Sequence, residues 1–245
     1  MLLAKVWDKI NTAMRRDIPS GTGFLSPREQ EMAQFLFGNH DGLLFFGGFE
    51  EAERRILFWL PEYLDESYLY SEDSPVVCLR AEFYQEDVLS HRDFLGALMG
   101  AGIARETIGD ICVSKGSCDF FVTAEIAPYI LQNLCSAGRT KLSLSKIPIP
   151  DARIPEPKIT VIRDTLASLR LDSVIASGFR IGRSLACQYI EAGKVAIDGL
   201  PCDKPDKTVA PGVKIALRGM GKIKLESLGG TSKKGRICVE IHRYV

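Results

Sequence analysis

The chain has few of the residues that metal sites and redox motifs require. Its 245 residues include three histidines, and these are too scattered in sequence to complete a zinc set. The seven cysteines are odd in number and form no Cys-x-x-Cys pair, so we interpret them as reduced core thiols. A glycine-rich phosphate loop of the Gly-x-Gly-x-x-Gly kind is also missing. The sequence therefore predicts no metal, no cofactor and no small-molecule substrate.

Long apolar runs are missing as well. No run of about 18 apolar residues occurs, which argues against a membrane-spanning helix. The N-terminal segment lacks the signal-peptide order of basic residues, apolar core and small-residue cleavage site, and it instead predicts an amphipathic helix. We therefore expect a cytoplasmic protein without a membrane partner.

The chain has no net charge, but each half does. Residues 165–245 hold 14 Lys and Arg against 7 Asp and Glu, a net of +7, whereas residues 1–164 hold 17 against 24, a net of −7. Opposite-signed halves favour a polyanion-binding C-terminal part on a more acidic carrier. An alternative is a scaffold whose acidic N-terminal half binds a protein.

Residues 1–72 are predicted to form an N-terminal α/β subdomain. Ser26 precedes a proline and stands three positions before Glu29, a pattern typical of a capped helix start. Short apolar stretches at 43–46 and 55–60 flank a glycine turn and predict a hairpin. We therefore expect a helix-plus-hairpin unit.

Residues 73–150 show the pattern of a ferredoxin-like domain. The predicted elements are a strand at 75–83, a helix at 90–100, strands at 110–113 and 119–122, a helix at 123–136 and a strand at 141–149. This order is shared by RNA-recognition domains. Phe120 and Phe121 occupy the third strand, where such domains stack bases; at least one must lie in the core because neighbours in a strand face opposite ways.

Four prolines between 148 and 160 predict a stiff linker, which we place at 151–163. After it, residues 164–245 should form a small α/β domain. We predict a helix at 164–177 closed by Ser177-Gly178, a second helix at 183–192, and strands at 195–197, 213–218, 222–228 and 236–242.

Basic residues surround the second of these helices. Arg180, Arg183 and Lys194 bracket it, and free backbone N–H groups at a helix start favour phosphate. A later loop, 232–236, carries three more basic residues, and a phosphate-binding surface shared with the helix becomes a reasonable hypothesis.

Several of these positions resemble the RNA-binding domain first described in ribosomal small-subunit protein four, the S-four (S4) domain. The matching positions are Arg170-Leu171-Asp172, Arg183-Ser184, Ala186, Ile190, Gly193-Lys194-Val195 and Lys204-Pro205. The segments FFGGFEEAERR, HRDFLGALMGAGIARETIGDI and RGMGKIKLESLGGTSKKGRICVEIHRYV are in turn similar to the bacterial YlmH family. This second resemblance spans nearly the whole chain.

The resemblance implies an α+β protein with an N-terminal α/β region, an RRM-like middle domain and a C-terminal S-four domain. It further implies a cytoplasmic, non-enzymatic protein that binds rRNA and tRNA on the large ribosomal subunit, in ribosome-associated quality control or rescue of stalled ribosomes. We predict RNA contacts at Arg170, Arg180, Arg183, Ser184, Gln188, Lys194, Lys204, Arg218, Lys222, Lys233, Lys234 and Arg236. Asp172 is expected to orient a neighbouring arginine.

Three positions depart from the S-four pattern. Gly182 replaces a common serine and loses a hydroxyl cap, Asp198 replaces a frequent asparagine and adds a negative charge, and Val213 stands where aspartate is usual. None of the three is expected to break the fold.

An RNA-modifying enzyme is the competing class, since S-four domains accompany pseudouridine synthases. The Arg-Leu-Asp sequence at 170–172 superficially resembles their catalytic motif, but no large catalytic domain follows it. His91 and the Gly109-Asp110 pair are interpreted as capping and turn residues. We therefore predict no catalytic residue.

Overall fold

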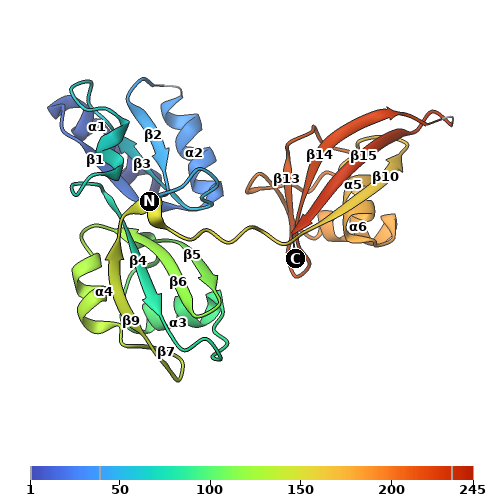
Figure 1. Ribbon diagram of the computed structural model, residues 1–245. Helices are drawn as coiled ribbons and strands as arrows, with labels where there is room; N and C mark the ends of the chain where they lie inside the picture. Colours follow the sequence, from blue (N-terminus) through green and yellow to red (C-terminus); the bar gives the residue numbers. More distant parts are fainter. Residues whose placement is uncertain (1, 39, 233, 245) are drawn as a thin grey trace. The chain divides into compact units, whose positions relative to one another are not determined.

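The computed structural model describes residues 2–38, 40–232 and 234–244. They divide into two compact units, Met1–Pro155 (unit 1) and Glu156–Val245 (unit 2), and each is described by itself. Helices and antiparallel sheets alternate in both units (Figure 1), which confirms the α+β class. Lys233, one of the predicted RNA contacts, lies outside the described residues.

Unit 1 begins with a small lobe of helices and a three-stranded sheet. Its elements are α1 Leu2–Arg16, β1 Ser20–Leu25, α2 Pro27–Phe37, β2 Leu43–Phe46 and β3 Arg55–Trp59, in the sheet order β1-β3-β2. The capping box is present: Ser26 N–H donates to the Glu29 carboxylate over 2.7 Å. The helix and the β2–β3 hairpin are confirmed, while β1 was not predicted.

The second part of unit 1 is ferredoxin-like. Its elements are η1 Glu66–Tyr70, β4 Val76–Glu82, α3 His91–Gly100, η2 Arg105–Thr107, β5 Ile108–Ser114, β6 Ser117–Thr123, α4 Ala127–Asn133, β7 Ser136–Ala137, β8 Thr140–Lys141, β9 Ser143–Ile147 and η3 Ile149–Asp151. The antiparallel order β5-β6-β4-β9 confirms the predicted topology. The helix predicted at 123–136 is shorter, because Thr123 still belongs to β6 and Ser136 begins the small β7–β8 hairpin.

Both faces of this sheet are covered. Phe120 packs among the residues beneath α3 and α4, whereas Phe121 packs with the N-terminal lobe and lies 5.3 Å from the ring of Phe49. Gly48 approaches so closely that an added Cβ would lie 2.3 Å from the Phe121 ring. Because both phenylalanines are completely buried, the base-stacking hypothesis is wrong for this arrangement.

Hydrogen bonds from Arg54 and hydrogen bonds to Asp110 connect the N-terminal lobe to the ferredoxin-like part of unit 1. The guanidinium of Arg54 donates to the carbonyl oxygens of Phe24 and Ile108, over 2.8 and 2.9 Å. In return, Asp110 accepts the backbone N–H groups of Glu53 and Arg54. Burial raises the pKa of Asp110, and these hydrogen bonds oppose that rise. Asp110 therefore holds the two parts of unit 1 together.

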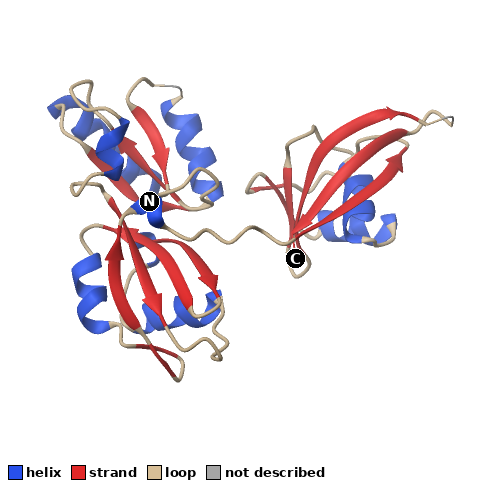
Figure 2. Ribbon diagram, in the orientation of Figure 1, coloured by secondary structure: helices blue, strands red, loops and turns tan. Residues whose placement is uncertain are grey.

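Unit 2 is one six-stranded antiparallel sheet with two helices on one face (Figure 2). Its elements are β10 Ile159–Leu166, α5 Leu171–Phe179, α6 Arg183–Glu191, β11 Val195–Ile197, β12 Leu200–Pro201, β13 Lys214–Leu217, β14 Gly221–Thr231 and β15 Ile237–Tyr244, in the order β10-β15-β14-β13-β11-β12. The core lies between the helices and the inward residues of the strands.

Two predictions at the start of unit 2 are wrong. Residues 164–166 belong to β10 and not to a helix, and the linker predicted at 151–163 contains the first five of that strand's eight residues. β10 pairs along its whole length with β15, from Ile159 opposite Tyr244 to Leu166 opposite Ile237. Pairing with a strand about 80 residues away in sequence decides the conformation, which local periodicity does not reveal.

The end of the first helix also differs from the prediction. Gly178 does not close α5 but lies buried inside it, and the helix continues to Phe179. An added Cβ at Gly178 would lie 2.6 Å from Cδ1 of Ile223. The glycine therefore lets the helix approach the sheet, and Arg180 in a left-handed conformation ends the helix instead.

The cysteines agree with the core-thiol interpretation in four of seven cases. Cys78, Cys112, Cys118 and Cys202 are buried. Burial raises the pKa of Cys112 to about 12. Burial also raises the pKa of Cys78 and Cys118, so these three thiols stay protonated at neutral pH and pack as small apolar side chains.

Candidate nucleic-acid interface

The first turn of α5 is anchored by a neighbouring loop. Leu171 N–H donates to the carbonyl of Lys207 over 2.8 Å, and Asp172 N–H donates to that of Pro205 over 3.0 Å. Arg170 precedes the helix in an extended conformation and forms a β-bridge with Thr208. The loop carrying Lys204-Pro205 thus satisfies N–H groups that a helix start leaves without partners.

Asp172 is a buried carboxylate that gathers two arginines. The Nη2 atoms of Arg170 and Arg183 each lie 3.0 Å from its Oδ2, and Ser173 Oγ lies 3.2 Å from its Oδ1. Burial alone would raise the pKa of Asp172, but the hydrogen bonds from Arg170, Arg183 and Ser173 outweigh it and hold the pKa at about 2. Asp172 therefore stays ionised and orients both arginines. The sequence predicts this role toward one neighbouring arginine.

Both arginines remain open to solvent. The side chain of Asp172 is only 2% exposed, while those of Arg170 and Arg183 are 40% and 58% exposed. A guanidinium carries five N–H donors, of which the shared carboxylate uses one or two. Two positive charges on one carboxylate also leave a net positive charge, a suitable arrangement for binding phosphate oxygens.

The start of α6 extends this surface. Gly182 is the N-cap residue and provides no side-chain cap, as expected from the loss of the usual serine. Arg183, Ser184 and Gln188 are exposed on the helix, whereas Ala186 and Ile190 face the core. Partial positive charge at a helix start and the Arg183 guanidinium therefore act at the same place.

A second basic pair lies where β13 leads into β14. Arg218 N–H donates to the carbonyl of Lys194 over 2.9 Å. The Lys194 ammonium lies 5.0 Å from the centre of the Tyr189 ring, which orients that side chain. Lys194 and Arg218 are both exposed.

The tip of the β14–β15 hairpin is distant from that pair. Lys222 pairs with Tyr244 at one end of the hairpin, and Thr231 pairs with Ile237 at the other (Figure 1). The intervening nine residue steps of strand span about 30 Å. Arg236 Nε donates to the carbonyl of Thr165 over 3.1 Å, so the tip is tied to the end of β10. The predicted residues therefore occupy separate places and do not form one compact surface.

The predicted contacts divide into four groups. The largest group lies in the α5–α6 region and consists of Arg170, Arg180, Arg183, Ser184, Gln188 and Lys204. Lys194 and Arg218 lie at the β13–β14 turn, and Lys234 and Arg236 lie at the hairpin tip. Lys222 lies on the sheet face away from the helices. Sequence reasoning missed Lys214 and Lys224 on that same face. Their alternation with Ile215, Ile223 and Leu225 could have identified them.

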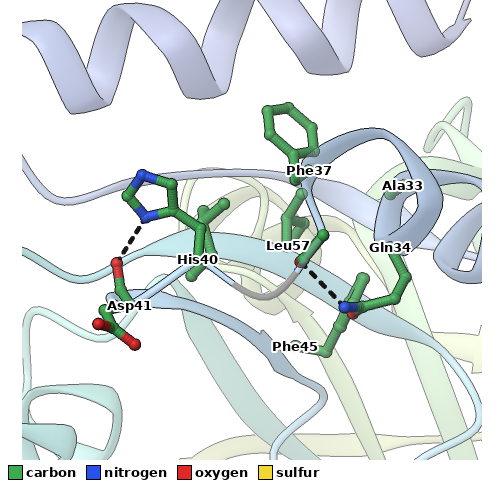
Figure 3. A pocket seen from close by; sticks show the side chains of 9 residues that line it. Ala33, Gln34, Phe37, His40, Asp41, Phe45 and Leu57 are labelled. Carbon is green, nitrogen blue, oxygen red and sulfur yellow. Dashed lines mark hydrogen bonds between the residues drawn. The ribbon is translucent and has the colours of Figure 1, made fainter.

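A pocket of about 170 Å³ lies in the N-terminal lobe, between the end of α2 and the β2–β3 hairpin (Figure 3). Leu43, Phe45 and Leu57 line it. On its polar side, Gln34 Nε2 donates to the carbonyl of Gly38 over 2.9 Å, and His40 Nδ1 lies 2.8 Å from the carbonyl of Asp41. Both contacts are with nearby backbone, so they stabilise the loop between α2 and β2.

Neither a metal-binding cluster nor a membrane-spanning helix occurs among the described residues. Among residues 2–38, 40–232 and 234–244, no group of three or more His, Cys, Asp or Glu is placed to hold a metal ion. None of the helices in this part of the chain is long and apolar enough to cross a membrane.

Comparison with known proteins identifies two domains. The family model described as "Putative RNA-binding domain in YlmH" matches residues 81–151, and the S4 domain model matches residues 169–215. The chain is 34% identical over 224 residues to the Ribosome-associated protein quality control protein P2 of Bacillus subtilis (strain 168), covering 91% of this chain and 86% of that protein.

A solved structure is similar in fold. It is the Cell division protein ylmH from Streptococcus pneumoniae, with a TM-score of 0.51 and 19% sequence identity, and it covers 63% of this chain and 93% of that one. The S4 match contains the Asp172 arginine pair, and the other match contains most of the ferredoxin-like part of unit 1.

Proposed function

Because the chain belongs to the YlmH family, we propose that it is a cytoplasmic, non-enzymatic RNA-binding protein that holds rRNA and tRNA on the large ribosomal subunit. Its role would be ribosome-associated quality control or rescue of stalled ribosomes. The B. subtilis relative is named for ribosome-associated quality control. That name supports the proposal, and unit 2 supplies the contact surface.

The observation that carries the proposal is the arginine pair on Asp172. Arg170, the N-cap residue of α5, and Arg183, the first residue of α6, share one buried carboxylate and stay exposed. An ion pair serving only stability would more readily be enclosed, whereas these guanidinium groups present donors to solvent. Oriented arginines bind phosphate at a lower entropic cost than freely rotating side chains.

The test is a charge reversal at Arg183. We expect folded Arg183→Glu protein to lose co-sedimentation with bacterial large ribosomal subunits, and its thermal midpoint to fall, because the new carboxylate faces the buried Asp172. The matched control is Arg16→Glu, which makes the same charge change at an exposed position at the end of α1. Co-sedimentation of Arg183→Glu equal to that of the control at moderate salt would refute the site.

The enzymatic alternative has its own test. A pseudouridine synthase leaves a modified nucleotide, so deletion of the gene would remove that nucleotide from rRNA or tRNA. We expect mass spectrometry of RNA from the deletion strain to show an unchanged set of modified nucleotides. The loss of one modification, restored by the wild-type gene, would establish an enzyme.

A further inference from the structure

The sheet of unit 2 has a second charged face, opposite to α5 and α6. Ile215, Ile223 and Ile241 point into the helix-covered core. Because side chains alternate along a strand, their neighbours Lys214, Lys222 and Lys224 point away from the helices. Within the described part of unit 2, no helix covers this face (Figure 2).

Three lysines gather on adjoining strands of this face. Lys214 on β13 stands directly opposite Lys224 on β14, and Lys222 lies two residues further along β14. Lys222 is flanked by Ala216 on one side and Tyr244 on the other.

The like-charged pair has an energetic cost. Directly opposed residues on neighbouring strands have Cβ atoms about 5 Å apart, and equal charges at that position destabilise a sheet. Glu226 offsets part of the cost through an ion pair of 2.9 Å with Lys224. Further along the face, Glu240 contacts Arg163 over 2.9 Å and His242 over 3.1 Å.

Basic residues outnumber acidic residues among the described residues of this face. Its basic residues are Arg163, Lys214, Lys222 and Lys224, and its acidic residues are Glu226 and Glu240. Glu240 lies on β15 beside Arg163 and Glu226 lies on β14 beside Lys224, whereas Lys214 on β13 and Lys222 at the start of β14 bring further positive charge. An opposed lysine pair within such an excess is stabilised by a bound polyanion.

We propose that this face, centred on Lys214, Lys222 and Lys224, binds the phosphate backbone of a second RNA segment while the Asp172 arginine pair holds the first. The inference rests on the proposed function. Lysines two residues apart on a strand are about 6.6 Å apart, close to the separation of neighbouring phosphates along an RNA strand. Unit 2 thereby joins two RNA segments from opposite sides of its sheet.

The test is stoichiometry with a short fluorescein-labelled RNA hairpin at low salt. We expect native mass spectrometry to find two hairpins per full-length wild-type protein. The triple variant Lys214→Gln, Lys222→Gln, Lys224→Gln should bind one hairpin, and the salt slope of its total binding should fall by roughly 2 to 3. Arg183→Glu should lose the other hairpin and keep the one on the sheet face.

Two control variants separate the loss of positive charge on this face from other effects of the substitutions. The triple variant Lys214→Arg, Lys222→Arg, Lys224→Arg keeps the charge and should retain two hairpins, which separates charge from a folding defect. Lys9→Gln, Arg15→Gln, Arg16→Gln removes three positive charges from α1 and should also retain two hairpins.

Three results would overturn the inference. One is a glutamine variant that still binds two hairpins with an unchanged salt slope. Another is a folded glutamine variant that binds none, because the two faces would then form a single site. A third is that poly-glutamate binds the lysine face more tightly than RNA does, while the hairpin on the arginine face is not displaced. That result would indicate an acidic protein partner. If Arg183→Glu alone keeps both hairpins and its ribosome binding, the proposed function fails instead.

Discussion

Each unit contains a buried aspartate that is paired with arginine, but the two ion pairs have different roles. In unit 1, Asp119 is bound by Arg80 through two hydrogen bonds of 2.6 and 2.7 Å, and their side chains are only 1% and 13% exposed. In unit 2, Asp172 is equally buried, but its two arginines extend into solvent.

The difference lies in what surrounds the arginine. Arg80 also donates to the carbonyl of Asp151, and Asp119 accepts the N–H of Arg153, so the pair fastens the end of unit 1 across its sheet. Arg170 and Arg183 have no such enclosing backbone among their described contacts. An aspartate–arginine ion pair thus stabilises the fold in unit 1, whereas in unit 2 the same kind of ion pair presents exposed guanidinium groups for binding.

The largest effect should come from breaking the enclosed pair. Asp119→Ala leaves Arg80 buried without its carboxylate, and we expect it to lower the free energy of unfolding of unit 1 by about 3 to 5 kcal/mol. Chemical denaturation followed by the fluorescence of Trp7 and Trp59, both in unit 1, measures this loss. Where the protein remains folded, RNA affinity should match the wild type; a loss of affinity in folded protein would contradict the comparison.

The equivalent change in unit 2 should have the opposite signature. We expect Asp172→Ala to lower stability by only about 1 to 3 kcal/mol, because its arginines can turn to water. Its affinity for RNA should fall by roughly tenfold, which corresponds to about 1.4 kcal/mol, since both arginines lose their orientation. Fluorescence anisotropy with an RNA hairpin checks the affinity. Unchanged affinity would show that Asp172 has no positioning role.

Acid should reveal the contribution of Asp172 to stability. Its pKa is held at about 2 in the folded protein against 3.8 ordinarily, so its stabilising effect is complete above about pH 4 and is lost as the pH falls toward 2. We expect the stability difference between wild type and Asp172→Asn to be constant from pH 7 to about 4 and to narrow below it. Thermal midpoints measured at successive pH values test this; a difference that widens in acid would have the wrong sign.

The smallest effect concerns the start of α6. Gly182 is an N-cap residue with no side-chain cap, and space is open around it. Gly182→Ser should therefore raise stability by a few tenths of a kcal/mol by adding a hydroxyl acceptor for a free N–H group. Thermal unfolding measures the gain, and Gly182→Ala is the control that adds a side chain without a cap. Equal midpoints for the two variants would show that the missing cap has no effect.

Local signals in the sequence were sufficient where the structure is local. Ser26 with Glu29, and Ser90 with Asp93, correctly mark helix starts because a capping box is formed by residues three apart. The order of the elements predicted between 75 and 149, with alternation only in β9, likewise identifies the ferredoxin-like sheet. The resemblance to the S-four domain draws attention to Arg170-Leu171-Asp172 and to one arginine oriented by Asp172, while the second arginine of the pair emerges from the structure.

Distant contacts account for the errors. β10 is a strand because β15 pairs with it, and Gly178 lies inside α5 because its missing side chain lets the helix approach Ile223. Phe121 is buried because a lobe from the first third of the chain covers the sheet. Lys222 was grouped with the helix-face residues because sequence alone did not assign the two faces of unit 2.

The most direct test of the central claim is photo-crosslinking of the protein to bacterial large ribosomal subunits, with mass spectrometry of the crosslinked peptides. The account predicts crosslinks at the Asp172 arginine pair and along α6, in peptides containing residues 170–191. Crosslinks confined to unit 1, with none in those peptides, would contradict it.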